Sequence, residues 1–100
     1  PFAAASFDTV TIDAVLHGAS DPVAVLRQAA RALRPGGRII LLDEVERLSR
    51  RVGHSMVEGV LRDWLERAGF AVLRMRRVPS RSEDMLVVVA RRATVLQDAA

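Results

Sequence analysis

The sequence predicts a small α/β domain whose sheet is mostly parallel. Residues 39–42 read Ile-Ile-Leu-Leu without polar alternation, which is typical of a strand covered on both faces by helices. Segments with strand and helix patterns also alternate along the chain, in the order strand, helix, strand, helix, strand, strand. The length of 100 residues suits one domain, which we expect to span residues 1–100 with frayed ends at 1–6 and 93–100.

Composition excludes several classes of protein. Half of the residues are hydrophobic and 27% are charged, as in a globular domain, and the lack of cysteine excludes disulfides and thiolate chemistry. The basic residues are all arginine and are interspersed with acids over most of the chain, so the net charge of +3 indicates a solvated surface rather than nucleic-acid binding. No apolar run approaches the roughly 18 residues of a membrane span, and the start lacks a signal-peptide pattern. We therefore expect a cytoplasmic protein with neither a membrane nor a nucleic-acid partner.

The first half of the chain predicts a strand, a helix and a turn. Phe7–Asp13 is rich in β-branched residues, with an apolar and a threonine-bearing face. Asp21 fits an N-cap and Pro22 the first position of a helix, whose apolar residues recur at helical spacing up to Leu33. Residues 35–37, Pro-Gly-Gly, suit a type II turn that leads into the apolar strand described above.

The middle of the chain predicts a loop and a second helix. Residues 43–53 are polar and charged, and we expect a loop with at most one helical turn. Ser55 and Glu58 fit a capping box at the start of a helix that ends before Gly69. The apolar residues of this helix form one stripe, which consists of Val57, Val60, Leu61, Trp64, Leu65 and Ala68.

Two strands close the predicted sheet. In Phe70–Val78, Leu73 and Met75 alternate with two arginines, so we expect these two apolar side chains to face the core from a strand at the sheet edge. Residues 85–90 are continuously apolar and predict an inner strand. Because no helix separates the last two strands, they are expected to be antiparallel neighbours.

Five segments of the chain, taken in order, carry a family resemblance. They are Phe7-Asp8, Val15-Leu16-His17, Asp21-Pro22, residues 33–42 and the run from Trp64 through Leu65, Glu66, Arg67, Ala68 and Gly69 to Phe70. Together they resemble the second half of class I S-adenosylmethionine-dependent methyltransferases of the small-molecule type. The resemblance covers nearly the whole chain. It implies a partial Rossmann-like methyltransferase fold with the half-sheet order 4-5-7-6, strand 7 antiparallel, and helices on both faces.

The resemblance also implies a function. The complete protein would transfer a methyl group from S-adenosyl-L-methionine to a small-molecule acceptor. The family's Gly-rich loop and ribose-binding acidic residue have no counterpart here, because Gly36 and Gly37 follow a helix rather than a strand. We therefore expect a truncated C-terminal portion that is inactive in isolation and is completed by a missing N-terminal half. Another Rossmann-like enzyme, such as a nicotinamide-dependent one, would need an upstream Gly-x-Gly-x-x-Gly.

The expected site lies beyond the carboxyl ends of the parallel strands, where such sheets bind ligands. The resemblance implies that Ile12, Asp13 and Ala14 meet the methionine end of the cofactor, and that Leu16 and His17 face the cofactor or substrate side. His17 follows Asp13 by four residues and could pair with it on a helical turn and act as a general base, or it could be a surface or packing residue. No histidine or carboxylate falls at a metal-ligand spacing, so no metal is expected.

A non-catalytic alternative concerns association. Without a neighbour on its other side, the strand Phe7–Asp13 would leave an edge open to pairing with a second copy of the chain. This interpretation predicts a homodimer or larger homo-oligomer. The chain would then be a folding or association module that dimerises through the edge at residues 7–13.

Overall fold

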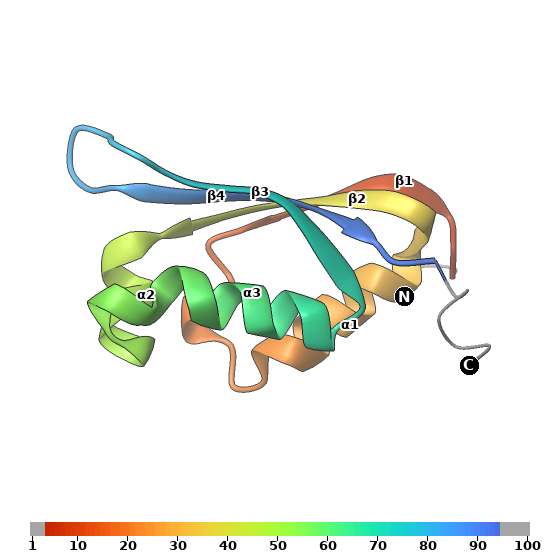
Figure 1. Ribbon diagram of the computed structural model, residues 1–100, viewed down its shortest axis with the longest axis horizontal. Helices are drawn as coiled ribbons and strands as arrows, with labels where there is room; N and C mark the ends of the chain where they lie inside the picture. The colour runs from red at the N-terminus through yellow and green to blue at the C-terminus, as the bar shows by residue number, and fades with distance from the viewer. Residues whose placement is uncertain (1–3, 95–100) are drawn as a thin grey trace.

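The computed structural model describes residues 4–94 as a four-stranded sheet with helices packed along it (Figure 1). In chain order the elements are β1 (Phe7–Asp13), the 3-10 helix η1 (Leu16–Gly18), α1 (Pro22–Ala32), β2 (Leu33–Glu44), α2 (Val45–Val52), the 3-10 helix η2 (His54–Met56), α3 (Val57–Arg67), β3 (Phe70–Val78) and β4 (Met85–Arg92). β1 and β3 have the bounds that the sequence predicts.

The order of the strands across the sheet is β1-β2-β4-β3. β1 runs parallel to β2, with Val10 beside Ile39, whereas β4 is antiparallel to both β2 and β3. This arrangement confirms the predicted half-sheet order 4-5-7-6 and its antiparallel inner strand. The continuously apolar β4 lies inside the sheet, and the arginine-bearing β3 lies at its edge, as predicted.

All three α-helices lie on one face of the sheet (Figure 1), which corrects the expectation of helices on both faces. The two crossovers, from β1 to β2 through α1 and from β2 to β3 through α2 and α3, each join parallel strands and advance in the same direction across the sheet. Right-handed crossovers that advance in one direction place their helices on the same face. We call this the helix face, and no element within residues 4–94 covers the opposite, open face.

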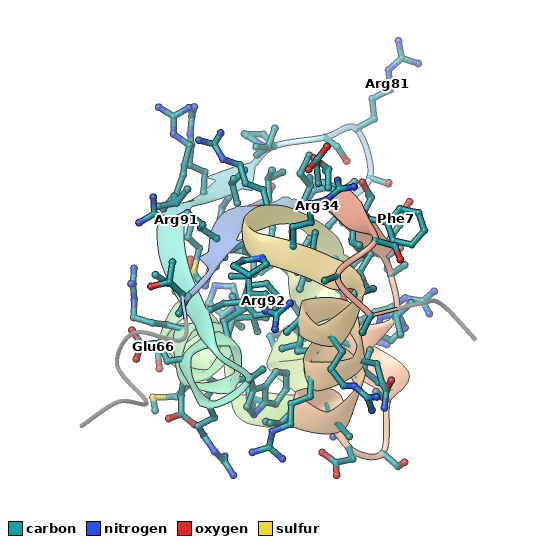
Figure 2. All side chains as sticks on the ribbon, turned by 90° about the vertical axis from the view of Figure 1, so that its right-hand side faces the viewer. Phe7, Arg34, Glu66, Arg81, Arg91 and Arg92 are labelled. Carbon is teal, nitrogen blue, oxygen red and sulfur yellow. The ribbon has the colours of Figure 1, made fainter. Side chains whose placement is uncertain are left out.

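The strand register assigns each side chain to a face. The open face carries Thr9, Thr11 and Asp13 from β1, Arg38, Ile40, Leu42 and Glu44 from β2, Met85, Val87, Val89 and Arg91 from β4, and Ala71, Arg74, Arg76 and Val78 from β3. Arg91 belongs to this face, whereas its neighbour Arg92 turns toward the helix side, where Nη1 donates to the Leu33 carbonyl (Figure 2). The hydrophobic core therefore lies between the helix face and the helices.

α1 begins and packs as predicted. The Asp21 carboxylate accepts a hydrogen bond from the Ala24 N–H at 3.0 Å, and Pro22 occupies the first turn. Leu26 of α1 and Leu61 of α3 are fully buried against the sheet. The apolar spacing of both helices is thus sufficient to define the faces that they bury.

The Pro-Gly-Gly segment lies within β2, where it forms a bulge, and Gly36 has the positive φ that the predicted type II turn requires. Phe7 of β1 pairs with Leu33 of β2, and the next pair is Thr9 with Arg38. β2 therefore uses five residues where β1 uses two. Gly36 has a φ of +81°, and a Cβ on Gly37 would lie 2.9 Å from the Arg34 carbonyl oxygen. Glycine is therefore required at both positions, once for the backbone conformation and once for space.

The expectation of a loop at residues 43–53 is wrong. The strand β2 continues through Glu44, and α2 occupies Val45–Val52. Val45 and Leu48 are buried and Val52 is partly buried. This spacing of three and four residues is that of a helix face, but the many charged residues around it obscure the pattern.

The predicted capping box at Ser55 is also wrong. α3 begins at Val57, and no side chain caps its N-terminus. Glu58 instead pairs with Arg77 of β3, whose Nε lies 2.5 Å from Oε2 and whose Nη2 lies 2.8 Å from Oε1. This bidentate hydrogen bond lowers the pKa of Glu58 from its ordinary value of 4.5 and raises that of Arg77. At the other end of α3, Gly69 has the predicted helix-ending role, with a φ of +97°.

A bulge in β3 changes the predicted alternation. The pairing with β4 shifts between Val72 and Arg74, which leaves Leu73 without a register partner. Its side chain is 47% exposed, so the expectation that Leu73 faces the core is wrong. Met75 does pack against the core, as expected.

The chain ends were expected to fray. Residues 1–3 and 95–100 lie outside the described residues, but Ala5 and Ser6 donate backbone hydrogen bonds to the end of α1, and Ala93 donates one to Gly69. These parts of the expected frayed ends are therefore tied to the domain. None of the helices described is long and apolar enough to cross a membrane.

Candidate functional site

The carboxyl ends of β1 and β2 meet at one edge of the sheet. Asp13 ends β1 and is exposed, and Ala14 follows it with a φ of +57°. The Ala14 N–H donates to the Leu42 carbonyl of β2 at 2.8 Å, which holds this backbone in place. Alanine rarely adopts a positive φ, and such conformations concentrate at functional sites. Ile12, Asp13 and Ala14 thus lie at the edge formed by the carboxyl ends of the parallel strands.

The two residues expected on the substrate side, Leu16 and His17, differ in burial. Leu16 is fully buried and belongs to the hydrophobic core, so it does not face a ligand, and this expectation is wrong. His17 follows in η1, and its side chain is 21% exposed. A three-residue helical turn directs adjacent side chains to different sides, which explains why only one of the two reaches the surface.

His17 pairs with Asp43 and not with Asp13. Its Nδ1 lies 2.8 Å from Asp43 Oδ1, and its backbone N–H donates to Oδ2 at 3.1 Å. The Asp43 side chain is fully buried, and Oδ1 also accepts the Glu44 N–H at 2.8 Å. The carboxylate therefore receives three hydrogen bonds, two of them from His17 itself.

This arrangement specifies how the imidazole can act. A carboxylate accepts hydrogen bonds only, so Nδ1 of His17 carries the proton that it donates, an assignment that follows from the partners. In the neutral ring the lone pair is then on Nε2, which is free to accept a proton from a ligand. A partly exposed histidine oriented by a buried aspartate has the chemistry of a general base.

Asp43 is a candidate functional residue that the sequence pattern does not reveal. It follows an apolar run and precedes a polar segment, a position typical of a surface residue, yet it is the one charged residue that is fully buried among residues 4–94. Its position at the end of β2, next to the end of β1, was a usable signal. His17 and Asp43 are 26 residues apart, and only the pairing of β1 with β2 brings them together.

A separate hollow is lined by neither His17 nor Asp43. It is lined by Val45, Glu46, His54, Ser82, Glu83 and Asp84, between the start of α2 and the β3–β4 hairpin, and has a volume of about 250 Å³. A hydrogen bond with the Glu44 carboxyl group raises the pKa of Glu83 there. Over the described part of the chain, no three histidine or carboxylate side chains gather in a way that could hold a metal ion.

The fold and this edge together define a class: a Rossmann-like half-sheet with polar groups at the carboxyl ends of its parallel strands. Residues 1–41 match the family model of the methyltransferase domain. The described chain is also similar to an S-adenosylmethionine-dependent methyltransferase from Mesorhizobium loti, with a TM-score of 0.72 and 18% identity over 91% of this chain and 64% of that one. The chain therefore has part of the fold of S-adenosylmethionine-dependent methyltransferases, and its first 41 residues match the family model.

Individual relatives act on small molecules, according to their names. A demethylmenaquinone methyltransferase of Mycobacterium sp. (strain KMS) is 49% identical over 43 residues, 43% of this chain and 19% of that protein. A 27-O-demethylrifamycin SV methyltransferase of Amycolatopsis mediterranei is 54% identical over 43 residues, 43% of this chain and 16% of the relative. A Burkholderia thailandensis 1,6-didemethyltoxoflavin-N1-methyltransferase, solved with 1,6-didemethyltoxoflavin and S-adenosylhomocysteine, has a TM-score of 0.72 at 23% identity, with 90% of this chain and 45% of that chain covered. The chain spans less than two thirds of each of these relatives.

Proposed function

We propose that the chain is the C-terminal part of an S-adenosylmethionine-dependent methyltransferase that acts on a small-molecule acceptor, with His17 as its general base. The observation that carries the proposal is the hydrogen bond of 2.8 Å between His17 Nδ1 and the buried Asp43. It lies at the same sheet edge as Asp13 and Ala14, because Asp13 pairs with Leu42, the residue before Asp43. A base and a candidate cofactor contact thus share one edge.

The residues present fit one end of the cofactor. Ala14 presents backbone at a positive φ, and the exposed Asp13 carboxylate beside it can accept hydrogen bonds from an ammonium group. We propose that this segment holds the methionine end of S-adenosyl-L-methionine, which supplies a methyl group activated by the positive charge of sulfur. Methyl transfer of this kind depends mainly on holding the acceptor and the methyl group in line at close range.

The role proposed for His17 is proton transfer. With the cofactor bound, the acceptor oxygen or nitrogen would take the methyl group while the bond from methyl carbon to sulfur breaks and S-adenosylhomocysteine leaves. Nε2 of His17 would take the proton that the acceptor loses. Nδ1 keeps its hydrogen bond to Asp43, whose negative charge stabilises the imidazolium that results. General bases of this kind contribute roughly 10²- to 10⁴-fold to a rate.

The experiment is methyl transfer by the full protein that contains this chain. Labelled S-adenosylmethionine and a panel of hydroxylated and nitrogen-containing small molecules would be incubated with it, and products identified by mass spectrometry. We expect a methylated product and a loss of about 10²-fold or more in kcat for His17→Ala. His54→Ala is the matched control, because His54 is the other histidine and its ring contacts Arg77 rather than Asp43. Absence of product across the panel would contradict the proposed activity, and an unchanged kcat for His17→Ala would contradict its role.

We also propose that the isolated chain is inactive and binds the cofactor weakly. In residues 4–94 the sheet has four strands, and the contacts proposed here reach only the methionine end. Each lost 1.4 kcal/mol of contact weakens binding about tenfold. Calorimetry with the isolated chain should therefore show no binding at micromolar concentrations, and a micromolar Kd would overturn this part. The cytoplasmic location expected from the sequence belongs to the same proposal and is open to cell fractionation.

A second candidate function is an association module. β1 is an outer strand of the sheet, and the open face carries partly buried apolar side chains from β2 and β4. Strand edges and apolar faces of this kind favour pairing with another copy. Analytical ultracentrifugation of the isolated chain should then show a dimer or larger species, with Thr11→Pro on β1 shifting it to monomer. A monomer at high concentration would exclude this function without affecting the methyltransferase proposal.

A further inference from the structure

The turn that presents His17 is held by few contacts of its own. η1 has three residues, its backbone hydrogen bonds from Gly18 to Val15 and from Ala19 to Leu16 are both 3.3 Å long, and no side chain caps it. Nothing lies within 4 Å of the position that a Cβ on Gly18 would occupy. Local interactions alone therefore do not specify the orientation of this turn.

Arg51 of α2 supplies what the turn lacks. Its Nη1 donates toward the carbonyl oxygen of Leu16 at 3.2 Å, that of His17 at 3.4 Å, and that of Ala19. The Leu16 carbonyl also accepts the Ala19 N–H, whereas the His17 and Ala19 carbonyl groups accept no hydrogen bond within the turn. Carbonyl groups at a helix end need such an external donor, and a guanidinium is well suited to several of them. One cation thus gathers three carbonyl groups from a four-residue segment.

The guanidinium is itself held in place. Its central carbon lies 5.5 Å from the centre of the Trp64 ring of α3, within the range of a cation–π contact. The planar group can therefore stack on the indole while its edge faces the carbonyl groups. This contact joins α3 to the turn through Arg51.

The two groups that hold His17 come from one continuous stretch of chain. Asp43 lies near the end of β2 on the helix face, and its carboxylate accepts hydrogen bonds from the imidazole and the backbone N–H of His17. Arg51, eight residues later in α2, donates to the carbonyl group of His17. We propose that Arg51 is a positioning residue for His17, which fixes the turn so that the imidazole reaches Asp43. The positioning of His17 by Arg51 does not depend on the proposed function. Only its effect on catalysis rests on that function.

The test measures His17 directly, without cofactor or acceptor. The protein has two histidines, so the ring signals of His17 and His54 can be followed separately by nitrogen-15 NMR. In Arg51→Ala we expect the His17 amide and Nδ1 protons to exchange with water faster by on the order of tenfold, because the turn opens more often. The His54 signals should not change. Arg50→Ala is the matched control, since Arg50 is an exposed neighbour on the same helix.

A conservative variant keeps the test decisive if Arg51→Ala does not fold. Lysine at this position retains the charge but not the planar donor edge, so Arg51→Lys should also accelerate His17 exchange. Unchanged His17 exchange in a folded Arg51→Ala or Arg51→Lys protein would overturn the inference. Faster His17 exchange in Arg51→Ala, together with no methyl transfer by the full protein, would uphold the positioning role and refute the proposed function, so the two failures are distinguishable.

Discussion

The two faces of the sheet carry similar apolar side chains but differ in what covers them. On the helix face, Ile39, Leu41 and Val88 are fully buried. On the open face, Ile40 and Leu42 from the same run are only partly buried. A continuously apolar sequence therefore does not reveal which face of the strand the helices of this chain cover. The stability of the described domain depends mainly on the helix face, because burial of apolar area is what stabilises it.

The charged residues show the same contrast. Arg77 lies on the helix side and makes a bidentate pair with Glu58, whereas its neighbour Arg76 lies on the open face and is exposed. Asp43 is fully buried with three donors, whereas Glu44 lies on the open face with its Oε1 2.5 Å from Nε of Arg47. Neighbouring residues of like charge thus have different roles, set by the face on which they lie.

The largest expected effect separates two adjacent leucines. Leu41→Ala on the helix face should lower the free energy of unfolding by about 2–5 kcal/mol, because it leaves a cavity in a packed core. Leu42→Ala on the open face should cost about 1 kcal/mol, because its side chain is already partly in solvent. Urea denaturation of both variants measures the difference. Equal losses would mean that the open face is as well packed as the helix face.

A smaller effect is expected for the buried carboxylate. Asp43→Ala leaves the His17 N–H without its acceptor and should lower the free energy of unfolding by about 1–3 kcal/mol. Glu44→Ala serves as its control and should change stability by no more than about 0.5 kcal/mol. Nitrogen-15 shifts of His17 should also report loss of the single Nδ1-protonated form in Asp43→Ala. A retained tautomer would show that Asp43 does not orient the ring.

The ion pair between Glu58 and Arg77 should depend on pH. Its hydrogen bond lowers the pKa of Glu58 below 4.5, so the stabilisation is present above pH 4.5 and is lost as the pH falls through the folded-state pKa. Because both side chains are partly exposed, Arg77→Ala should cost only about 0.5–1 kcal/mol at neutral pH, and Arg76→Ala close to none. Thermal unfolding between pH 3 and 7 tests this, and Glu58→Gln should remove the contribution of this pair to the pH dependence. An unaltered profile in Glu58→Gln would contradict the assignment.

The smallest expected effect concerns the bulge in β3. Leu73→Ser should change the free energy of unfolding by no more than about 0.5 kcal/mol, because the leucine is 47% exposed and has no register partner. Met75→Ser should cost about 1–2 kcal/mol, since methionine packs against the core. Denaturation curves for the pair would show whether the bulge is present in solution. A larger loss for Leu73→Ser than for Met75→Ser would mean that the Leu73 side chain faces the core, as the sequence alternation predicts.

Much of the fold could be predicted because its signals are local. The N-cap at Asp21, the spacing of apolar residues in α1 and α3, and the helix end at Gly69 each depend on a few neighbouring residues. The helix α2 was missed because its apolar positions are surrounded by charges, and the capping box was wrong because Glu58 has a stronger partner in β3. In that case a contact distant in sequence overrides a local pattern.

For the site, the sequence indicated the place but not the pairing. The family resemblance points to His17, and the spacing of four residues makes Asp13 one possible partner for it. The structure instead brings Asp43 to the imidazole, because the parallel pairing of β1 with β2 aligns their carboxyl ends. Hydrogen bonds across a sheet depend on strand register, which periodicity alone does not specify.

The sequence by itself determined the order of the four strands and of the helices α1 and α3, the bounds of β1 and β3 to the residue, and the antiparallel inner position of β4. These features follow from hydrophobic spacing and backbone preference, which act over a few residues. Only the tertiary structure decided which face the helices cover, which acid holds His17, and which arginine secures its turn. Those outcomes depend on the direction of the crossovers and on strand register, and both are properties of segments that are far apart in the chain.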